Sequence, residues 1–146
     1  MNKHQLKLCV TVTPTGHPTV KVSLGNQCHQ QELCNSHTFE FDQLVDTGTV
    51  LTVELIDKSP LDPHTAVNID SIEIFGIQDP KFVWAGEYQP SYPEPWASQQ
   101  RQAGIDLPQT KTAQTYLGWN GIWQLHITVP VFVWMHQIQG LGLIYK

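Results

Sequence analysis

The chain has 146 residues, a formal net charge of −5 at pH 7 and only 14% charged residues, with a single arginine at Arg101. A nucleic-acid-binding surface needs clustered lysines and arginines, so this composition excludes nucleic acid as the expected partner. No window approaches the roughly 18 apolar residues of a membrane span, and the opening MNKHQLKLCV lacks the apolar run of a signal peptide. We therefore expect no membrane contact, no signal peptide and one domain, residues 1–146.

Alternating apolar and polar residues predict the first strands. Residues 6–13 and 19–24 each place their apolar side chains on one face, and the turn-forming residues 15–18 separate them. Residues 37–42 and 50–56 show the same period of two. These last two segments are expected to form a hairpin.

The strand expected over residues 66–77 contains an irregularity. Its apolar residues fall into two pairs, each in phase internally, but the pairs are offset from one another by one residue. A β-bulge between the pairs would restore a continuous buried face. The pairs are Val67/Ile69 and Ile72/Ile74, and the bulge is expected at Asp70-Ser71.

The strongest strand pattern lies near the end of the chain. Trp123, Leu125, Ile127 and Val129 alternate with polar residues, which predicts a strand that buries this face in the core. The turn-forming pair Asn120-Gly121 precedes it, so the chain is expected to enter this strand through a hairpin from residues 115–119.

One helix is predicted, with Pro95 in its first turn and Gly104 as its terminator. Short apolar runs at residues 81–84, 131–134 and 141–145 are interpreted as further strands. About nine or ten short strands at this spacing indicate a sandwich or barrel. The sequence therefore predicts an all-β fold, a two-sheet antiparallel jelly-roll sandwich with one short helix.

The segment 87–100 is the richest candidate for a contact surface. Its three prolines favour an extended path that would hold Tyr88, Tyr92 and Trp96 in place, with the neutral amide of Gln99 nearby and Trp119 as a further candidate. Aromatic faces and amides suit sugar rings, or a protein partner. The alternative is that the aromatic residues only pin the loop to the sandwich, which the preference of large aromatic side chains for burial favours.

Two weaker metal sites are conceivable. Cys28, His29, Cys34 and His37 could bind zinc, but their spacing is unlike that of zinc fingers and ribbons, which favours a disulfide or two free thiols. The odd number of cysteines, three, indicates synthesis in a reducing compartment.

A calcium site is the second. Asp57, Asp62 and Asp70, with Asp79 nearby, could supply oxygen ligands from neighbouring loops. Turn aspartates that cap their own backbone are the more common outcome. No cofactor other than such a structural calcium is predicted.

The sequence contains no known catalytic motif. The remaining candidates for catalysis are carboxylates on the predicted strands. Glu40, Glu54 and Glu73 point outward from three predicted strands, and a polysaccharide-active enzyme would need two such carboxyls across a cleft. This enzymatic alternative stays open beside the nonenzymatic interpretation.

The segment AVNIDSIEIFGI, followed by a W-x-G-x-Y-x-P run, resembles the late strands of noncatalytic carbohydrate-binding β-sandwich modules, particularly the small calcium-assisted xylan-binding type. The resemblance covers about half of the chain and implies a jelly roll, glycan binding through loop aromatics and often a structural calcium. A sandwich without a secretion signal is also similar in architecture to bacteriophage virion accessory proteins, which decorate capsids or tails.

These observations together predict a nonenzymatic β-sandwich module that works by binding. Its expected partner is a glycan or a neighbouring virion subunit, with a homo-oligomer left open. The expected location is a virion or the extracellular space, after synthesis in the cytoplasm.

Overall fold

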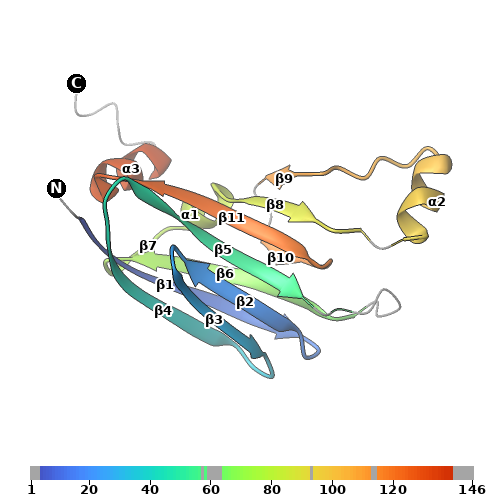
Figure 1. The fold of residues 1–146 in the computed structure, drawn as a ribbon, viewed down its shortest axis with the longest axis horizontal. Coiled ribbons are helices and arrows are strands. Elements are labelled where there is room, and N and C mark those ends of the chain that lie inside the picture. The colour runs from blue at the N-terminus through green and yellow to red at the C-terminus, as the bar shows by residue number, and fades with distance from the viewer. Residues whose placement is uncertain (1–3, 57, 59–63, 93, 113–114, 140–146) are drawn as a thin grey trace.

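The computed structural model describes residues 4–56, 58, 64–92, 94–112 and 115–139, whose strands form two antiparallel sheets packed face to face (Figure 1). Among these residues, sheet A has five strands and sheet B has six. Sheet A contains, in spatial order, β10 (Tyr116–Leu117), β6 (Ala66–Ile74), β1 (His4–Thr15) and β4 (His37–Val45), with β7 (Ile77–Gln78) also paired to β6. Sheet B contains β3 (Gln27–Glu32), β2 (Thr19–Leu24), β5 (Gly48–Ile56), β11 (Gly121–Thr128), β8 (Glu87–Pro90) and β9 (Lys111–Thr112).

The two-sheet antiparallel sandwich expected from the sequence is therefore confirmed. The chain crosses from one sheet to the other between β1 and β2, β3 and β4, β4 and β5, and β5 and β6. Such crossed connections are those of jelly-roll and Greek-key sandwiches.

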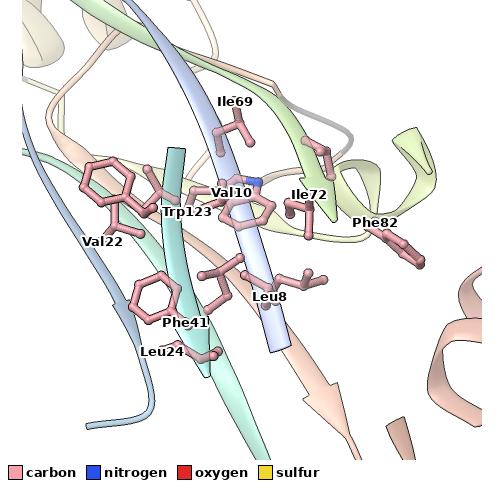
Figure 2. Close-up of a cluster of buried hydrophobic side chains, with 14 of the residues drawn as sticks. Leu8, Val10, Val22, Leu24, Phe41, Ile69, Ile72, Phe82 and Trp123 are labelled. Atoms are coloured by element: carbon pink, nitrogen blue, oxygen red, sulfur yellow. The ribbon is translucent and has the colours of Figure 1, made fainter. Parts of the chain in front are cut away.

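Period-two alternation builds the core, because it sends every second side chain of a strand toward the facing sheet. Of the predicted face on β11, Trp123, Leu125 and Ile127 are buried, and Val129, just past the strand, packs partly buried against them. Figure 2 shows the side chains of both sheets meeting in one cluster. Its labelled members are Leu8, Val10, Val22, Leu24, Phe41, Ile69, Ile72, Phe82 and Trp123.

The predicted bulge in β6 is confirmed. Thr11 of β1 pairs with Ser71, whereas the next residue, Val12, pairs with Ile69, so Asp70 is the extra residue on β6. Asp70 is exposed, while Ile69 on one side and Ile72 on the other are both buried. The additional residue thus keeps both apolar pairs on the core face.

Both expected hairpins are wrong. β4 pairs with β1 in sheet A, and β5 pairs with β2 and β11 in sheet B. Likewise β10 pairs with β6, in the sheet opposite to β11. Alternation specifies which face of a strand is buried but not which strand lies beside it, and a turn between two strands can lead across the sandwich as readily as along one sheet.

Three short helices are described where one was predicted. The expected helix is α2 (Trp96–Gln102), and it ends before Gly104, whose φ of +83° is the left-handed conformation anticipated for the terminator. The predicted strands at residues 81–84 and 131–134 are wrong, because they are α1 (Pro80–Trp84) and α3 (Val131–Gln139). The predicted strand at residues 141–145 lies outside the described residues.

Local signals explain both helices. The side chain of Asp79 accepts a hydrogen bond of 2.9 Å from the backbone N–H of Lys81, which caps α1, and Pro80 occupies its first turn. In α3 the buried residues are Val131, Trp134 and Met135, at spacings of three and four, a helical pattern that a four-residue window cannot reveal. α1 packs against β6 and α3, and α3 lies at the end of the molecule opposite to α2 (Figure 1). Within the described part of the chain, no helix is both long and apolar enough to cross a membrane.

Candidate binding site

Three aromatic side chains from separate segments meet near α2. Trp96 begins α2, Tyr92 lies in the segment before it, and Trp119 lies between β10 and β11. The ring centroids of Trp96 and Trp119 are 4.8 Å apart, and the ring of Tyr92 stands edge-on to Trp119 at 5.8 Å. We call these three residues the aromatic cluster.

The aromatic cluster lies outside the hydrophobic core. Each of its three side chains is partly exposed, and none belongs to the contiguous set of buried residues between the sheets. Part of each side chain therefore remains available to another molecule, which is the condition that a contact surface must meet.

Tyr88 of β8 fixes the position of Trp119. Its ring is buried, with 1% exposure, and its hydroxyl accepts a 3.1 Å hydrogen bond from the backbone N–H of Trp119 while donating to the backbone carbonyl of the same residue. Both backbone groups of Trp119 are thus satisfied by one core side chain. Tyr88 was expected to be a contact residue, but its burial makes it a support beneath the aromatic cluster, since alternation along β8 turns its ring toward the core.

Lys58 and Asn120 reinforce the same region from opposite parts of the chain. The backbone N–H of Lys58 donates to Oδ1 of Asn120 at 3.0 Å, and Nδ2 of Asn120 donates to the carbonyl of Lys58 at 2.8 Å. The ammonium group of Lys58 lies 5.4 Å from the ring centroid of Trp119 and donates to the carbonyl of Gly118. A cation at this distance is attracted by the negative face of the indole.

Neither Lys58 nor Asn120 was a candidate from the sequence. Asn120 was interpreted as a turn residue, and Lys58 lies in a polar loop, so only their contact across 62 positions of the chain reveals their role. No local sequence signal could have indicated that contact.

The hydroxyl of Tyr92 anchors the segment that follows α2. It donates a 2.7 Å hydrogen bond to the carbonyl of Pro108. Burial raises the pKa of Tyr92, the negative charge of Asp106 raises it further, and Arg101 opposes these effects. The phenol therefore stays protonated at neutral pH and keeps this hydrogen bond.

The remaining predicted contact residue, Gln99, is exposed on α2. On the same helix Ala97 is buried and Trp96 is partly exposed. Of the predicted contact residues, the structure thus brings Tyr92, Trp96 and Trp119 together, with Gln99 on the helix that carries Trp96.

The four predicted zinc ligands are not brought together. Cys28 pairs with Ser23 near one end of β3, and Cys34 lies beyond the other end, so the strand between them spans about 13 Å or more. A single zinc ion holds its ligands within about 2.3 Å, so it cannot bind both thiols. Both cysteines are free, which decides between the disulfide and the two thiols.

The two histidines of that set have aromatic neighbours. His29 lies 5.4 Å from the ring of Phe41, and His37 lies 4.6 Å from the ring of Phe39 in an edge-on arrangement. Together with Phe39 and Glu40 they line a pocket of about 260 Å³ between the edge strands β3 and β4.

Of the predicted calcium ligands, Asp57 and Asp62 lie outside the described residues. Asp70 is engaged at the bulge, where its carboxylate accepts hydrogen bonds from Nδ2 of Asn68, at 2.7 Å, and from the hydroxyl of Thr13. Asp79 caps α1 through its side chain. Asp79 therefore caps nearby backbone, as the alternative interpretation expected, whereas Asp70 bonds to two side chains instead.

The outward carboxylates divide between the sheets. Glu40 and Glu73 flank Cys9 on the outer face of sheet A, because both pair with it in the strand register, whereas Glu54 belongs to sheet B. Two strand spacings, about 9.5 Å, separate the backbone of Glu40 from that of Glu73. Burial raises the pKa of Cys9, and the two glutamates raise it further, so this thiol is protonated at neutral pH.

Comparisons of the chain with protein-family models, with curated proteins and with solved structures each give no match.

Proposed function

We propose that this chain is a nonenzymatic binding module and that the aromatic cluster is its contact surface for a glycan. The observation that supports this most strongly is the placement of Tyr92, Trp96 and Trp119 outside the core, partly exposed and in contact with one another. Residues that served only to fill the sandwich would lie between its sheets.

The surroundings of the aromatic cluster suit a neutral polyhydroxylated ligand. Indole and phenol faces stack on the C–H faces of sugar rings, and such a site needs a few well-placed polar groups to fix the ligand. The amides of Gln89 on β8 and Gln99 on α2 are exposed near the segment that carries Tyr92 and Trp96. The backbone of Trp119, held by Tyr88, keeps part of the surface organised before binding, which reduces the entropy lost on association.

The test is binding to a panel of soluble xylans, glucans and mannans, measured by affinity electrophoresis and calorimetry. Wild-type protein should bind at least one of them, and Trp119→Ala should weaken that binding by about 2 kcal/mol, roughly thirtyfold in Kd. Trp84→Ala is the matched control, because Trp84 is 50% exposed on α1, away from the aromatic cluster.

Two results would count against this function. Equal losses in Trp119→Ala and Trp84→Ala, or no binding anywhere in the panel, would refute the aromatic cluster as a glycan surface. Release of reducing sugar ends that is abolished in Glu40→Gln or Glu73→Gln would instead support the enzymatic alternative.

A second candidate function is attachment to a neighbouring subunit of a larger assembly such as a virion. It is favoured by an apolar pocket of about 370 Å³ that is lined in part by Val131 and Phe132 of α3. Phe132 is 53% exposed there and stacks on Phe75, with ring centroids 5.1 Å apart. The lining residues are His4, Gln5, Phe75, Pro130, Val131 and Phe132.

An exposed apolar hollow of this kind accepts an apolar side chain from a partner. Analytical ultracentrifugation of the protein, alone and within its native assembly, tests this candidate. Phe132→Ser should then release the protein from the assembly, whereas a release caused by Trp96→Ala would assign the attachment to the aromatic cluster.

A further inference from the structure

We propose that His17, Glu32 and Cys34 form a binding site for a divalent transition-metal ion, with zinc as the ion that their donor atoms suit best. Each residue offers one ligand atom, an imidazole nitrogen, a carboxylate oxygen or a sulfur, and these atoms all lie within 4.8 Å of one another. This site shares only Cys34 with the zinc site predicted from the sequence, and it contains no residue of the aromatic cluster.

The backbone holds the three residues side by side. His17 lies in the turn between β1 and β2, whereas Glu32 ends β3 and Cys34 follows it. Glu32 pairs with Thr19 in the β2–β3 register, and the backbone N–H of Leu33 donates a 2.8 Å hydrogen bond to the carbonyl of Pro18. The two segments that carry the ligands are therefore tied together at the positions next to them.

Core packing fixes these same neighbours. Pro18 and Leu33 are both buried, Leu33 with 1% exposure, whereas His17, Glu32 and Cys34 are exposed. Each buried residue thus lies beside a ligand in the sequence and anchors its backbone. The ligand side chains remain able to rotate, and an ion can approach them from solvent.

The donor set selects the kind of ion. Imidazole and thiolate are ligands for zinc and related transition metals, whereas calcium and magnesium prefer oxygen ligands alone. Bonds of about 2.0 to 2.3 Å around a tetrahedral zinc ion place its ligand atoms roughly 3.5 Å apart. The exposed side chains can rotate and bring their ligand atoms about 1 Å closer together, which reaches the spacing that zinc requires.

Three protein ligands leave one tetrahedral position open. Structural zinc sites fill all four positions with protein groups, while sites with three keep a place for water or for a donor from a bound molecule. The ion at this site would therefore exchange with solvent and could bind a donor group of a partner.

The second exposed cysteine provides an internal control. Cys28 and Cys34 are both exposed and free, but Cys28 lies toward the far end of β3. Alkylation by iodoacetamide is followed by mass spectrometry of proteolytic peptides, which distinguishes Cys9 from the other two cysteines. Two variants are compared: Cys28→Ser, which reports on Cys34, and Cys34→Ser, which reports on Cys28. Zinc chloride should slow the alkylation of Cys34 at least about tenfold, because a metal-bound thiolate is no longer available to the reagent, and should leave Cys28 unchanged.

Cobalt binding tests the other two ligands. In the Cys28→Ser background, Co²⁺ should give the near-ultraviolet absorption of a cobalt–thiolate bond. His17→Ala and Glu32→Gln should each weaken Co²⁺ and Zn²⁺ binding by more than about tenfold. His29→Ala is the matched control, since His29 is an exposed histidine of β3 outside the proposed set. Circular dichroism should show the same fold in all variants, because the three ligand residues are exposed.

Equal protection of Cys28 and Cys34 by zinc, or the same loss of affinity in His29→Ala as in His17→Ala, would overturn the site. Metal binding that survives His17→Ala and Glu32→Gln but disappears with Cys34→Ser would do so as well, because it would show a single thiol binding metal without the other two ligands.

Discussion

The backbone N–H of Trp119 lies 3.1 Å from the hydroxyl of Tyr88, so the partly exposed aromatic cluster is hydrogen-bonded directly to a core side chain. Tyr88 also donates to the carbonyl of Trp119. Because one residue serves both interactions, the hydroxyl of Tyr88 should contribute to stability and should also set the alkaline limit of the fold.

Tyr88→Phe removes that hydroxyl and leaves the backbone of Trp119 without its partner. We expect a loss of about 1 to 2 kcal/mol in the free energy of unfolding at pH 7, measured by urea denaturation. Tyr92→Phe is the matched control, because its hydroxyl bonds in a more exposed position, to Pro108, and should cost less.

The same variant predicts a change in pH dependence. Burial raises the pKa of Tyr88 from 10.0 to about 12, against the opposing effect of the hydrogen bond from Trp119. The unfolded chain releases this proton near pH 10 while the folded protein retains it, so stability should fall as the pH rises from 10 to 12, by at most about 2.7 kcal/mol. Tyr88→Phe should show a shallower fall in this window, and an identical slope in both proteins would contradict the assignment.

Any side chain at Gly86 should destabilise the fold, because Gly86 packs directly on the ring of Trp123. A Cβ added at Gly86 would overlap the six-membered ring and lie 2.7 Å from Nε1. Trp123 is fully buried in the packed core, so its ring has little room to withdraw. Gly86→Ala should cost about 1 to 3 kcal/mol in unfolding free energy.

A double-mutant cycle isolates this contact. Trp123→Phe removes the part of the ring that Gly86 approaches, so Gly86→Ala should cost less in that background, with a coupling of about 1 kcal/mol or more. Additive losses would mean that the cost arises from the backbone of Gly86 rather than from Trp123.

The bulge in β6 yields a prediction about deletions. Removing Asp70 leaves Val67, Ile69, Ile72 and Ile74 in one unbroken alternation with the same partners on β1. The protein without Asp70 should fold, and its free energy of unfolding should fall by no more than about 2 kcal/mol. The loss would come mainly from the hydrogen bonds that Asp70 makes with Asn68 and Thr13.

Deleting Asn68 instead provides the contrast. It would turn the buried Val67 to the outer face, and it should cost at least about 2 kcal/mol more than the deletion of Asp70. Chemical denaturation of both variants measures the difference, and equal losses would show that register along β6 does not depend on the apolar pairs.

Periodicity explains which features the sequence could predict. The buried face of β11 and the bulge at Asp70 follow from the spacing of apolar residues, because burial repeats every second position along a strand. Strand neighbours do not follow from it, as the pairing of β4 with β1 rather than β5 shows. α3 was missed since its helical spacing emerges only when Met135 is included.

The residues of the candidate site also fall into those that the sequence could predict and those that it could not. Tyr92 and Trp96 stand out locally in a proline-rich segment, so the sequence could nominate them. The burial of Tyr88 and the hydrogen bonds between Lys58 and Asn120 depend on how distant segments of the chain pack together. They are therefore visible only in the three-dimensional structure.

The variant Trp96→Ala distinguishes a role of Trp96 in ligand binding from a role in packing. Trp96 is partly exposed, 4.8 Å from Trp119 and 6.2 Å from Tyr92 between ring centroids. Loss of these ring contacts in Trp96→Ala should lower the unfolding free energy by about 1 kcal/mol, since aromatic pairs contribute about 0.5 to 1.5 kcal/mol each. The fully buried Trp123 is the reference for a packing role, and Trp123→Ala should cost about 3 to 5 kcal/mol.

Binding should respond in the opposite order. If Trp96 contacts the ligand, Trp96→Ala weakens glycan or partner binding by about 2 kcal/mol or more, because anchor residues concentrate the energy of an interface. Trp84→Ala, which truncates an exposed tryptophan of α1, should change neither quantity by more than about 0.5 kcal/mol. A loss of 3 kcal/mol or so in the folding of Trp96→Ala, with full affinity in the molecules that remain folded, would assign Trp96 to packing and remove it from the contact surface.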